Sequence, residues 1–213
     1  MVSRNHILPA VVMVALIATI AYNNRWDRQS PPHRTASPAD YPPPAAATAG
    51  WTRLVDPCLV EWEGNDGDSF RLRHRDGTGT YRLYFVDTPE KNRSFPDRLY
   101  HQSRYFGGIT TDRVIAAGEA ARDFGLPLLR SQPLEVWTRG ERVMDSDRLH
   151  ALVRFPRRSN RWLHEELVSA GLARIYTLPT DLPDGTPKEA HLRHLGVLEA
   201  EARAAHRGAW AKR

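Results

Sequence analysis

Four carboxylates of one short stretch of the chain are spaced in a way that suggests chemistry. The stretch NDGDSFRLRHRDGTGTYRLYFVDTPE covers residues 65–90 and contains Asp66, Asp68, Asp87 and Glu90. Asp66 and Asp68 are two positions apart, so their side chains point the same way on an extended backbone. Carboxylates that converge repel one another unless a cation lies between them. Oxygen ligands without a nearby cysteine favour Ca²⁺ or Mg²⁺ over zinc.

Arginines alternate with these carboxylates, and Arg82 stands nearest to the second acidic pair. A guanidinium group binds phosphate well because it can donate two parallel hydrogen bonds. The pattern therefore allows a metal-dependent phosphate-handling site. It equally allows aspartates that form turns between solvated strands. An EF-hand loop is excluded, because the twelfth position counted from Asp66 is Gly77, where a glutamate is required.

Short strands must position these residues. Residues 68–75 and 81–86 alternate between apolar and polar side chains, and turn-forming Asn, Asp and Gly residues precede each. Further strands are predicted at 54–64, 133–140 and 149–155. Helices are predicted over 110–125, with Gly125 as the stop, and over 162–171 and 188–208. The pattern predicts a mainly β, α+β domain: a five-stranded Greek-key barrel of the OB-fold type with about three helices. A split α+β sandwich is the competing architecture.

The first 50 residues differ in composition from the rest. Residues 1–28 place Arg4 before an uncharged run from Ile7 to Tyr22, which predicts an N-terminal hydrophobic helix that acts as a signal anchor or a signal peptide. Either exports the remainder of the chain, and we favour an uncleaved membrane anchor. Cleavage would give a secreted or periplasmic protein, and a buried core helix is the alternative. Residues 29–50 are rich in Pro and Ala and predict an extended linker, so the folded domain spans residues 51–213.

Composition narrows the function classes. The chain has 213 residues, 41% of them hydrophobic, which is enough for a packed core. Its formal net charge of +5 favours a polyanionic partner, because neutralising phosphates releases condensed counterions. The single cysteine, Cys58, excludes an intramolecular disulfide and a cysteine-based metal site.

The motifs DGDS and RLYFVDTPE resemble the signature of the staphylococcal nuclease (thermonuclease) family. In that family a DGDT-like turn precedes a strand of the pattern Arg-Leu-x-x-x-Asp-x-Pro-Glu, and Ser69 stands here at the threonine position. Residues 162–175 resemble the short helix and following strand of the family, and residues 191–210 resemble its last helix. The resemblance covers roughly residues 54–210 and implies the OB-type barrel.

The resemblance also implies a role for each matching acidic residue. Asp68 and Asp87 would bind Ca²⁺ through their carboxylates, and Thr88 would bind it through its backbone carbonyl. Asp66 would lie behind these ligands. Glu90 would orient or deprotonate the attacking water.

Two arginines and a tyrosine complete the implied site. Arg82 would clamp the scissile phosphate and stabilise charge on its equatorial oxygens. Arg148 matches a second family arginine, although Ser146 and Asp147 replace the usual Tyr and Gly. Asp147 could pair with Arg148, and a structural salt bridge is the alternative role of this arginine. Tyr176 resembles a tyrosine that lines the nucleotide pocket; a core or surface tyrosine is the alternative.

Two further segments carry chemistry-bearing residues. The loop over residues 91–108 is longer than the family pattern, and its arginines and aromatic rings could follow single-stranded nucleic acid. Alternatively, the rings anchor the loop. His191 and His194 have helical spacing, but without a clear acidic or third histidine ligand we interpret them as a solvated helix face.

These features predict an exported, Ca²⁺-dependent endonuclease that hydrolyses DNA and RNA with low sequence specificity and leaves 3′-phosphate ends. Single-stranded or frayed duplex substrates are favoured, and no obligate protein partner is expected. The alternative is a catalytically weak or inactive OB-type nucleic-acid-binding module tethered to the membrane. A third interpretation is a membrane-tethered envelope protein whose partner is another protein.

Overall fold

The computed structural model describes residues 50–131, 133–157 and 161–212. The predicted signal segment and nearly all of the predicted linker lie outside the described residues. Within the described part, no helix is long and apolar enough to span a bilayer.

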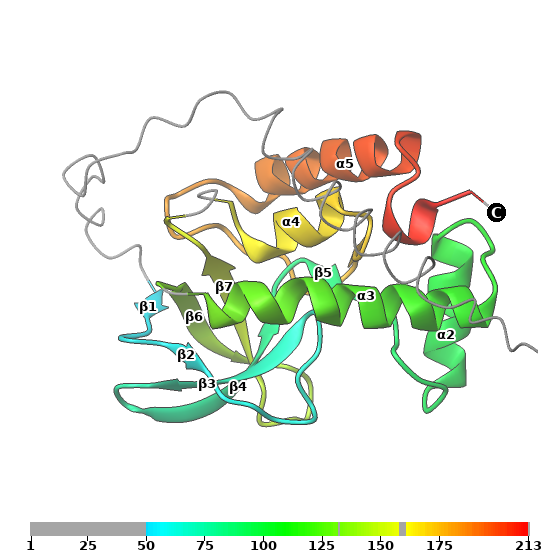
Figure 1. The fold of residues 1–213 in the computed structure, drawn as a ribbon. Coiled ribbons are helices and arrows are strands. Elements are labelled where there is room, and N and C mark those ends of the chain that lie inside the picture. Colours follow the sequence, from blue (N-terminus) through cyan, green and yellow to red (C-terminus); the bar gives the residue numbers. More distant parts are fainter. Residues whose placement is uncertain (1–49, 132, 158–160, 213) are drawn as a thin grey trace, which may run out of the picture. The chain divides into compact units, whose positions relative to one another are not determined.

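A curled six-stranded sheet forms the centre of the domain (Figure 1). In spatial order its strands are β1 (Thr52–Arg53), β6 (Glu135–Arg142), β7 (Leu149–Arg154), β4 (Gly77–Leu83), β3 (Ser69–His74) and β2 (Cys58–Leu59). All neighbouring strands are antiparallel except β4 and β7, which are parallel. A separate antiparallel pair consists of β5 (Val86–Asp87) and β8 (Arg174–Ile175).

The prediction of a mainly β, mixed α+β fold is confirmed, but the strand details differ. The main sheet has six strands instead of five, because β1 lies before the first predicted strand and pairs with β6. The strand predicted over 54–64 shrinks to the two residues of β2. Asp56 has a φ of 52° and Pro57 has no backbone N–H to donate, so this run bends instead of extending.

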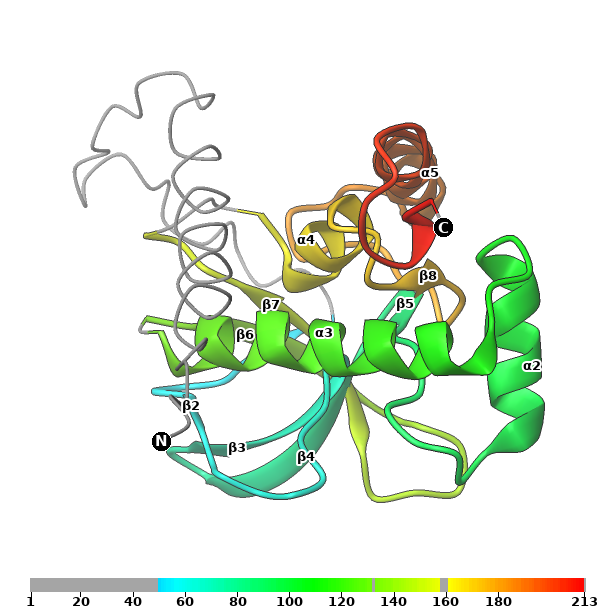
Figure 2. The same cartoon turned by 45° about the vertical axis from the view of Figure 1, so that its right-hand side comes forward.

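The α-helices of the described residues are α2 (Pro96–Tyr105), α3 (Thr111–Arg130), α4 (Leu163–Ser169) and α5 (Lys188–Ala204), followed by the 3₁₀ helix η2 (Gly208–Trp210). In both views α3 crosses in front of the curled sheet with α2 at its end, while α4 and α5 lie together on the other side of α3 from β3 and β4 (Figures 1 and 2).

The prediction of a loop over residues 91–108 is wrong, because α2 occupies most of this segment. Pro96 starts this helix with a preset φ, and Asp97 in the first turn complements the helix dipole. Gly107 and Gly108 end it with φ values of 82° and 78°. The sequence did not predict this helix, because Leu99 is its single aliphatic residue.

Helix α3 runs five residues past Gly125, the residue predicted to stop it. A Cβ atom at this position would lie 3.4 Å from the carbonyl oxygen of Gly67, so the helix packs closely on the turn before β3. Gly125 is therefore a packing residue and not a cap.

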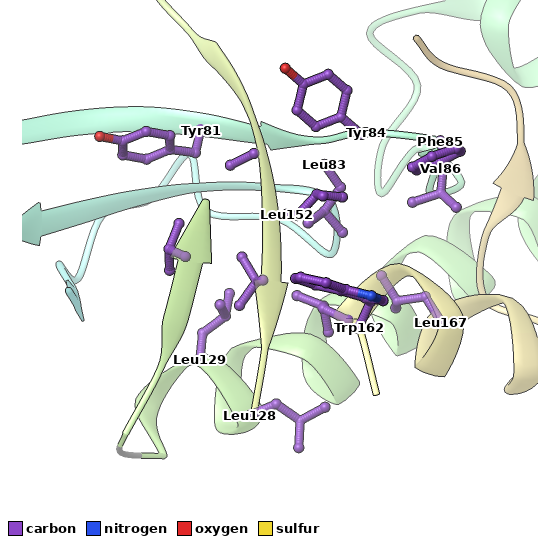
Figure 3. Close-up of a cluster of buried hydrophobic side chains, with 14 of the residues drawn as sticks. Tyr81, Leu83, Tyr84, Phe85, Val86, Leu128, Leu129, Leu152, Trp162 and Leu167 are labelled. Atoms are coloured by element: carbon purple, nitrogen blue, oxygen red, sulfur yellow. The ribbon is translucent and has the colours of Figure 1, made fainter. Parts of the chain in front are cut away.

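The core lies between the curled sheet and the helices. Figure 3 shows Leu83 of β4 and Leu152 of β7 beside Trp162 and Leu167, with Leu129 of α3 in the same cluster. Burying each such side chain contributes roughly 1.5–3 kcal/mol relative to exposure. This cluster holds the end of β4 in place, where the predicted site begins.

Gly118 lets α3 approach the segment that carries the predicted site. A Cβ atom there would lie 2.4 Å from the carbonyl oxygen of Pro89 and 2.6 Å from that of Glu90. Contacts this short are forbidden, so only glycine permits the observed distance between the helix and residues 87–90.

We expect Gly118→Ala to lower the free energy of unfolding by roughly 1–3 kcal/mol, because the new methyl group must push backbone away from backbone. The matched control is Gly196→Ala in α5, where a Cβ atom meets nothing within 4 Å. That change is expected to stabilise the protein by up to about 1 kcal/mol through helix propensity. Urea denaturation of both variants measures the difference, and equal stability would contradict this account.

His191 is not part of a solvated helix face, which corrects the prediction for this position. It is only 3% exposed, and its Nε2 atom lies 2.7 Å from Nε2 of His164 on α4. Glu165 lies on its other side, 3.9 Å from Nδ1 of His191 and 3.4 Å from Nε2 of His194. Only His194 is exposed as predicted. The histidine pair packs α5 against α4, a contact that the sequence spacing within α5 does not reveal.

Burial and the nearby His194 lower the pKa of His191 to about 4. The unfolded chain therefore binds a proton on His191 before the folded chain does, and the free energy of unfolding falls as the pH drops from about 6.5 to about 4. The loss is at most about 1.4 kcal/mol per pH unit. Burial lowers the pKa of His164 as well, so His164 adds to this loss, whereas the pKa of Glu165, which burial raises, offsets part of it.

We expect His191→Asn to flatten this pH dependence, measured by urea denaturation between pH 7 and pH 4. His206→Asn is the control, because His206 is exposed and its φ of 54° suits asparagine. If both variants keep the slope of the unchanged protein, another group is responsible.

Candidate functional site

Strand register brings the predicted site residues together. The β3–β4 register pairs Ser69 with Arg82, so Asp68 lies next to this arginine. The β5–β8 register places Asp87 opposite Arg174. The β4–β7 register pairs Tyr81 with Leu149, so Arg148, the residue before β7, lies near the end of β4 that carries Arg82.

A strained residue aims Asp87 into the site. Phe85 lies between β4 and β5 with a φ of 70°, which is rare for a bulky side chain and persists only where the surroundings enforce it. Its N–H donates to the carbonyl of Leu178 at 3.1 Å, and its carbonyl accepts from the N–H of Tyr176 at 2.8 Å. Its ring packs against His164 and His191, at centroid distances of 5.1 and 4.8 Å. These contacts turn the chain so that Asp87 points at Arg82.

Arg82 bridges the two predicted metal-binding carboxylates. Its Nη2 atom lies 2.5 Å from Oδ1 of Asp87 and 3.2 Å from Oδ2 of Asp68. Its Nη1 atom donates to the Ser69 hydroxyl at 3.3 Å. Burial alone would lower the pKa of Arg82, but the two carboxylates outweigh this effect and raise it. The guanidinium is therefore charged and nearly buried.

Asp87 is 1% exposed and surrounded by donors. Besides Arg82, its Oδ1 atom contacts Arg98 at 2.9 Å, while its Oδ2 atom accepts from Arg174 and Gln102 at 2.8 and 2.9 Å. Burial would raise the pKa of Asp87, yet the cationic and amide partners hold it below its ordinary value. The carboxylate is thus ionised despite its burial.

Glu90 shares a partner with Asp87. The Nη2 atom of Arg98 lies 2.8 Å from Oε1 of Glu90, so one guanidinium joins the carboxylates of Asp87 and Glu90. Burial raises the pKa of Glu90, although Arg98 works against this shift. Glu90 is therefore more basic than an exposed glutamate. We refer to Asp68, Asp87 and Glu90 as the carboxylate cluster.

Gln102 of α2 connects three of the predicted residues and is 0% exposed. Its side-chain carbonyl accepts the N–H of Glu90 at 2.9 Å, while its amide donates to Asp87 Oδ2 and, at 3.1 Å, to the carbonyl of Thr88. The N–H of Thr88 in turn donates to Oδ2 of Asp68 at 2.8 Å. This neutral residue fixes the segment from Asp87 to Glu90.

Sequence reasoning did not find Gln102 or Arg174, and it placed Arg98 on a loop. Gln102 carries no charge and lies outside the matched motifs, so no sequence signal marked it. Arg174 becomes a site residue only through the β5–β8 pairing. The helical spacing of Arg98 and Gln102, four positions apart, would have placed both on one face of α2.

Arg148 is half-buried at the edge of the site, and Asp147 does not pair with it. Asp147 contacts Arg142 instead, at 3.3 Å. The guanidinium of Arg148 reaches the Ser69 hydroxyl at 3.5 Å and the Ser146 hydroxyl at 3.3 Å, with no salt bridge among the described residues. Burial, Arg82 and Arg98 lower the pKa of Arg148. Arg82 and Arg148 therefore meet at Ser69, where an anion would contact both.

Asp66 and Tyr176 lie at the margins. The Asp66 carboxylate accepts the N–H of Gly67 at 2.8 Å and lies 3.8 Å from Lys91. Burial and the adjacent Asp68 raise the pKa of Asp66 to about 6. Tyr176 is 66% exposed and carries the Arg174 guanidinium 3.9 Å from its ring centre. This contact with Arg174 connects Tyr176 to the site.

The donor chemistry of the cluster suits a hard cation. No group of three or more His, Cys, Asp or Glu side chains in the described part of the chain is arranged to hold a metal ion. The expected ligand set is of a different kind, because it combines the carboxylates of Asp68 and Asp87 with the backbone carbonyl of Thr88. One guanidinium nitrogen already bridges Asp68 and Asp87, so both can share a single cationic partner. All three donors are oxygens, as Ca²⁺ requires.

No protein-family model matches the chain, and a comparison with curated proteins finds no match.

We expect Gln102→Leu to lower the free energy of unfolding by roughly 2–4 kcal/mol, because it leaves the N–H of Glu90 and the carbonyl of Thr88 without this buried partner. Gln102→Glu keeps the acceptor but sets a carboxylate against Asp87. Its folded-state pKa should rise, so Gln102→Glu should regain stability as the pH falls from 7 to 5. Gln102→Leu should show no such regain. Urea denaturation at both pH values tests this, and a fully stable Gln102→Glu at pH 7 would contradict the assigned hydrogen bonds.

Proposed function

We propose that this chain is a Ca²⁺-dependent phosphodiesterase of the staphylococcal nuclease type, which hydrolyses DNA and RNA with low sequence specificity and leaves 3′-phosphate ends. The observation that carries the proposal is the meeting of Arg82 and Arg148 at Ser69, directly beside the carboxylate cluster. Two guanidinium groups next to ionised carboxylates form a site for a phosphodiester and for a divalent cation.

Each residue has a task that its surroundings support. Arg82 and Arg148 bind the phosphate and stabilise the charge that develops on its equatorial oxygens. Glu90 orients the attacking water and accepts its proton, and its raised pKa makes it a better base than an exposed glutamate. Asp68, Asp87 and the carbonyl of Thr88 would hold Ca²⁺, which when bound supplies further charge stabilisation at the phosphate.

The proposal includes a barrel of the OB type. The strands β2, β3 and β4 form a meander, and the chain then returns through β6 so that β7 lies beside β4. β1 and β2 lie at opposite edges of this sheet although only residues 54–57 separate them along the chain, so the curled sheet turns back toward itself, which supports a barrel. Such barrels present one face to oligonucleotides.

We also propose export and membrane attachment through residues 1–28, or release as a secreted or periplasmic protein after cleavage. The uncharged run in that segment and the linker over residues 29–50 support this part of the proposal. A single folded domain behind a linker needs no obligate protein partner to reach a nucleic acid.

One observation favours a second candidate, a catalytically weak or inactive nucleic-acid-binding module. Both oxygens of Asp87 are held by arginine or amide groups, and Arg98 also pairs with Glu90. A cation must replace some of these contacts. If it cannot, the arginines would still bind phosphates without cleaving them.

The deciding experiment incubates the full-length chain with 5′-labelled single-stranded DNA or RNA in Ca²⁺ or in EGTA. We expect cleavage only with Ca²⁺, and product ends that terminal transferase extends only after phosphatase treatment. Glu90→Gln and Arg82→Ala should slow cleavage by a factor on the order of 10²–10⁴. Arg73→Ala is the matched control, because Arg73 is an exposed arginine on β3. Binding without cleavage in Ca²⁺ would support the second candidate and defeat the first.

A further inference from the structure

Helix α2 exposes two large aromatic rings that its packing does not require. Phe95 and Tyr100 are 52% and 60% exposed. The helix is anchored by other residues: Leu99 and Phe106 pack with α3, and the Tyr105 hydroxyl donates to Glu199 of α5. Tyr105 therefore acts as the predicted anchor of this segment, whereas more than half of the surface of Phe95 and of Tyr100 is exposed.

An arginine accompanies each exposed ring. Cζ of Arg98 lies 5.6 Å from the Phe95 ring centre, and Cζ of Arg104 lies 6.0 Å from that of Tyr100. We refer to Phe95, Arg98, Tyr100 and Arg104 as the α2 aromatic surface. Rings next to guanidinium groups suit a nucleic-acid strand, because bases stack on the rings while phosphates pair with the cations.

The α2 aromatic surface is continuous with the carboxylate cluster. The guanidinium that lies near Phe95 is the one that contacts Asp87 and Glu90, at 2.9 and 2.8 Å. A hollow of about 230 Å³ adjoins Tyr100 and is lined by Arg93, Pro96, Leu99, Tyr100, Ser103 and Thr111. A strand with one phosphate at the site would therefore meet exposed rings and a recess with its neighbouring nucleotides.

We propose that the α2 aromatic surface binds the unpaired nucleotides that flank the cleaved phosphate, by stacking their bases on Phe95 and Tyr100. This inference rests on the proposed function and assigns the expected preference for single strands to these two rings. In a duplex the bases stack on one another and cannot offer their faces to these rings. The rings thus select single-stranded substrate, while the arginines bind phosphates of either form.

The test measures binding of the full-length chain, in EGTA, to a fluorescent oligothymidylate about 12 nucleotides long, a length within the usual site sizes. Phe95→Ala and Tyr100→Ala are each expected to weaken binding roughly 5- to 100-fold, the range found for loss of one stacked base. Phe95→Trp and Tyr100→Trp should retain it. Val197→Ala is the control, because Val197 is 56% exposed on α5, and thermal unfolding should be unchanged in all variants.

Four outcomes would overturn the inference. The alanine variants could bind single strands as the unchanged protein does, or the tryptophan variants could fail to restore binding. Ring loss could weaken binding to duplex and to single strands equally, which would leave only charge as the cause of binding. Ring-dependent sedimentation with anionic vesicles, without an effect on single-stranded DNA, would assign the rings to a membrane. In contrast, ring-dependent strand binding by a chain that does not cleave in Ca²⁺ would defeat the proposed function alone.

Discussion

The ionised carboxylate of Asp87, 1% exposed, is the constraint on which the rest of the structure depends. A buried charge is tolerated only when partners compensate for its lost hydration, and truncation of such a partner is strongly destabilising. The four partners of Asp87 come from three elements: β4, β8 and two successive turns of α2. These elements must dock together before the charge is neutralised, so the site and the fold share one set of contacts.

Glycines and one strained residue determine how closely the elements approach. Gly118 lets α3 approach the segment after β5, and Gly67 lets the turn before β3 approach Thr88 and Ala121, because a Cβ atom at either glycine would lie 3.0 Å or less from its nearest neighbours. Phe85 adopts a left-handed backbone conformation that its contacts with α4 and α5 must stabilise. Helix α3 therefore packs against the site from one side, and α4 and α5 pack against it from another. Among the described residues, none of these three helices contributes a charged group to the site.

Local patterns predicted β3, β4, β6 and β7 and the helices α3, α4 and α5, because alternation in residues 69–74 and helical spacing in residues 111–124 reflect one buried face each. They failed where the role of a residue depends on its contact with a residue far away in the sequence. Gly125 reads as a helix stop but packs on Gly67, and His191 reads as solvated but meets His164. In the site, motif matching located the carboxylates and Arg82. Gln102 escaped because its role follows from the placement of α2, and no local pattern encodes that placement.

The pairing of Asp87 with Arg174 also has a consequence for how the protein is made. The two residues are separated by 87 positions, and β5 pairs with a strand that leaves the ribosome long after it does. Chains are synthesised from the N-terminus, so during most of synthesis Asp87 lacks one of its guanidinium partners and β5 lacks β8. A chain that ends before β8 would hold Arg82, Arg98 and Gln102 but would lack Arg174 and the β5–β8 pairing. The complete set of partners of Asp87 is therefore present only after β8 has been made.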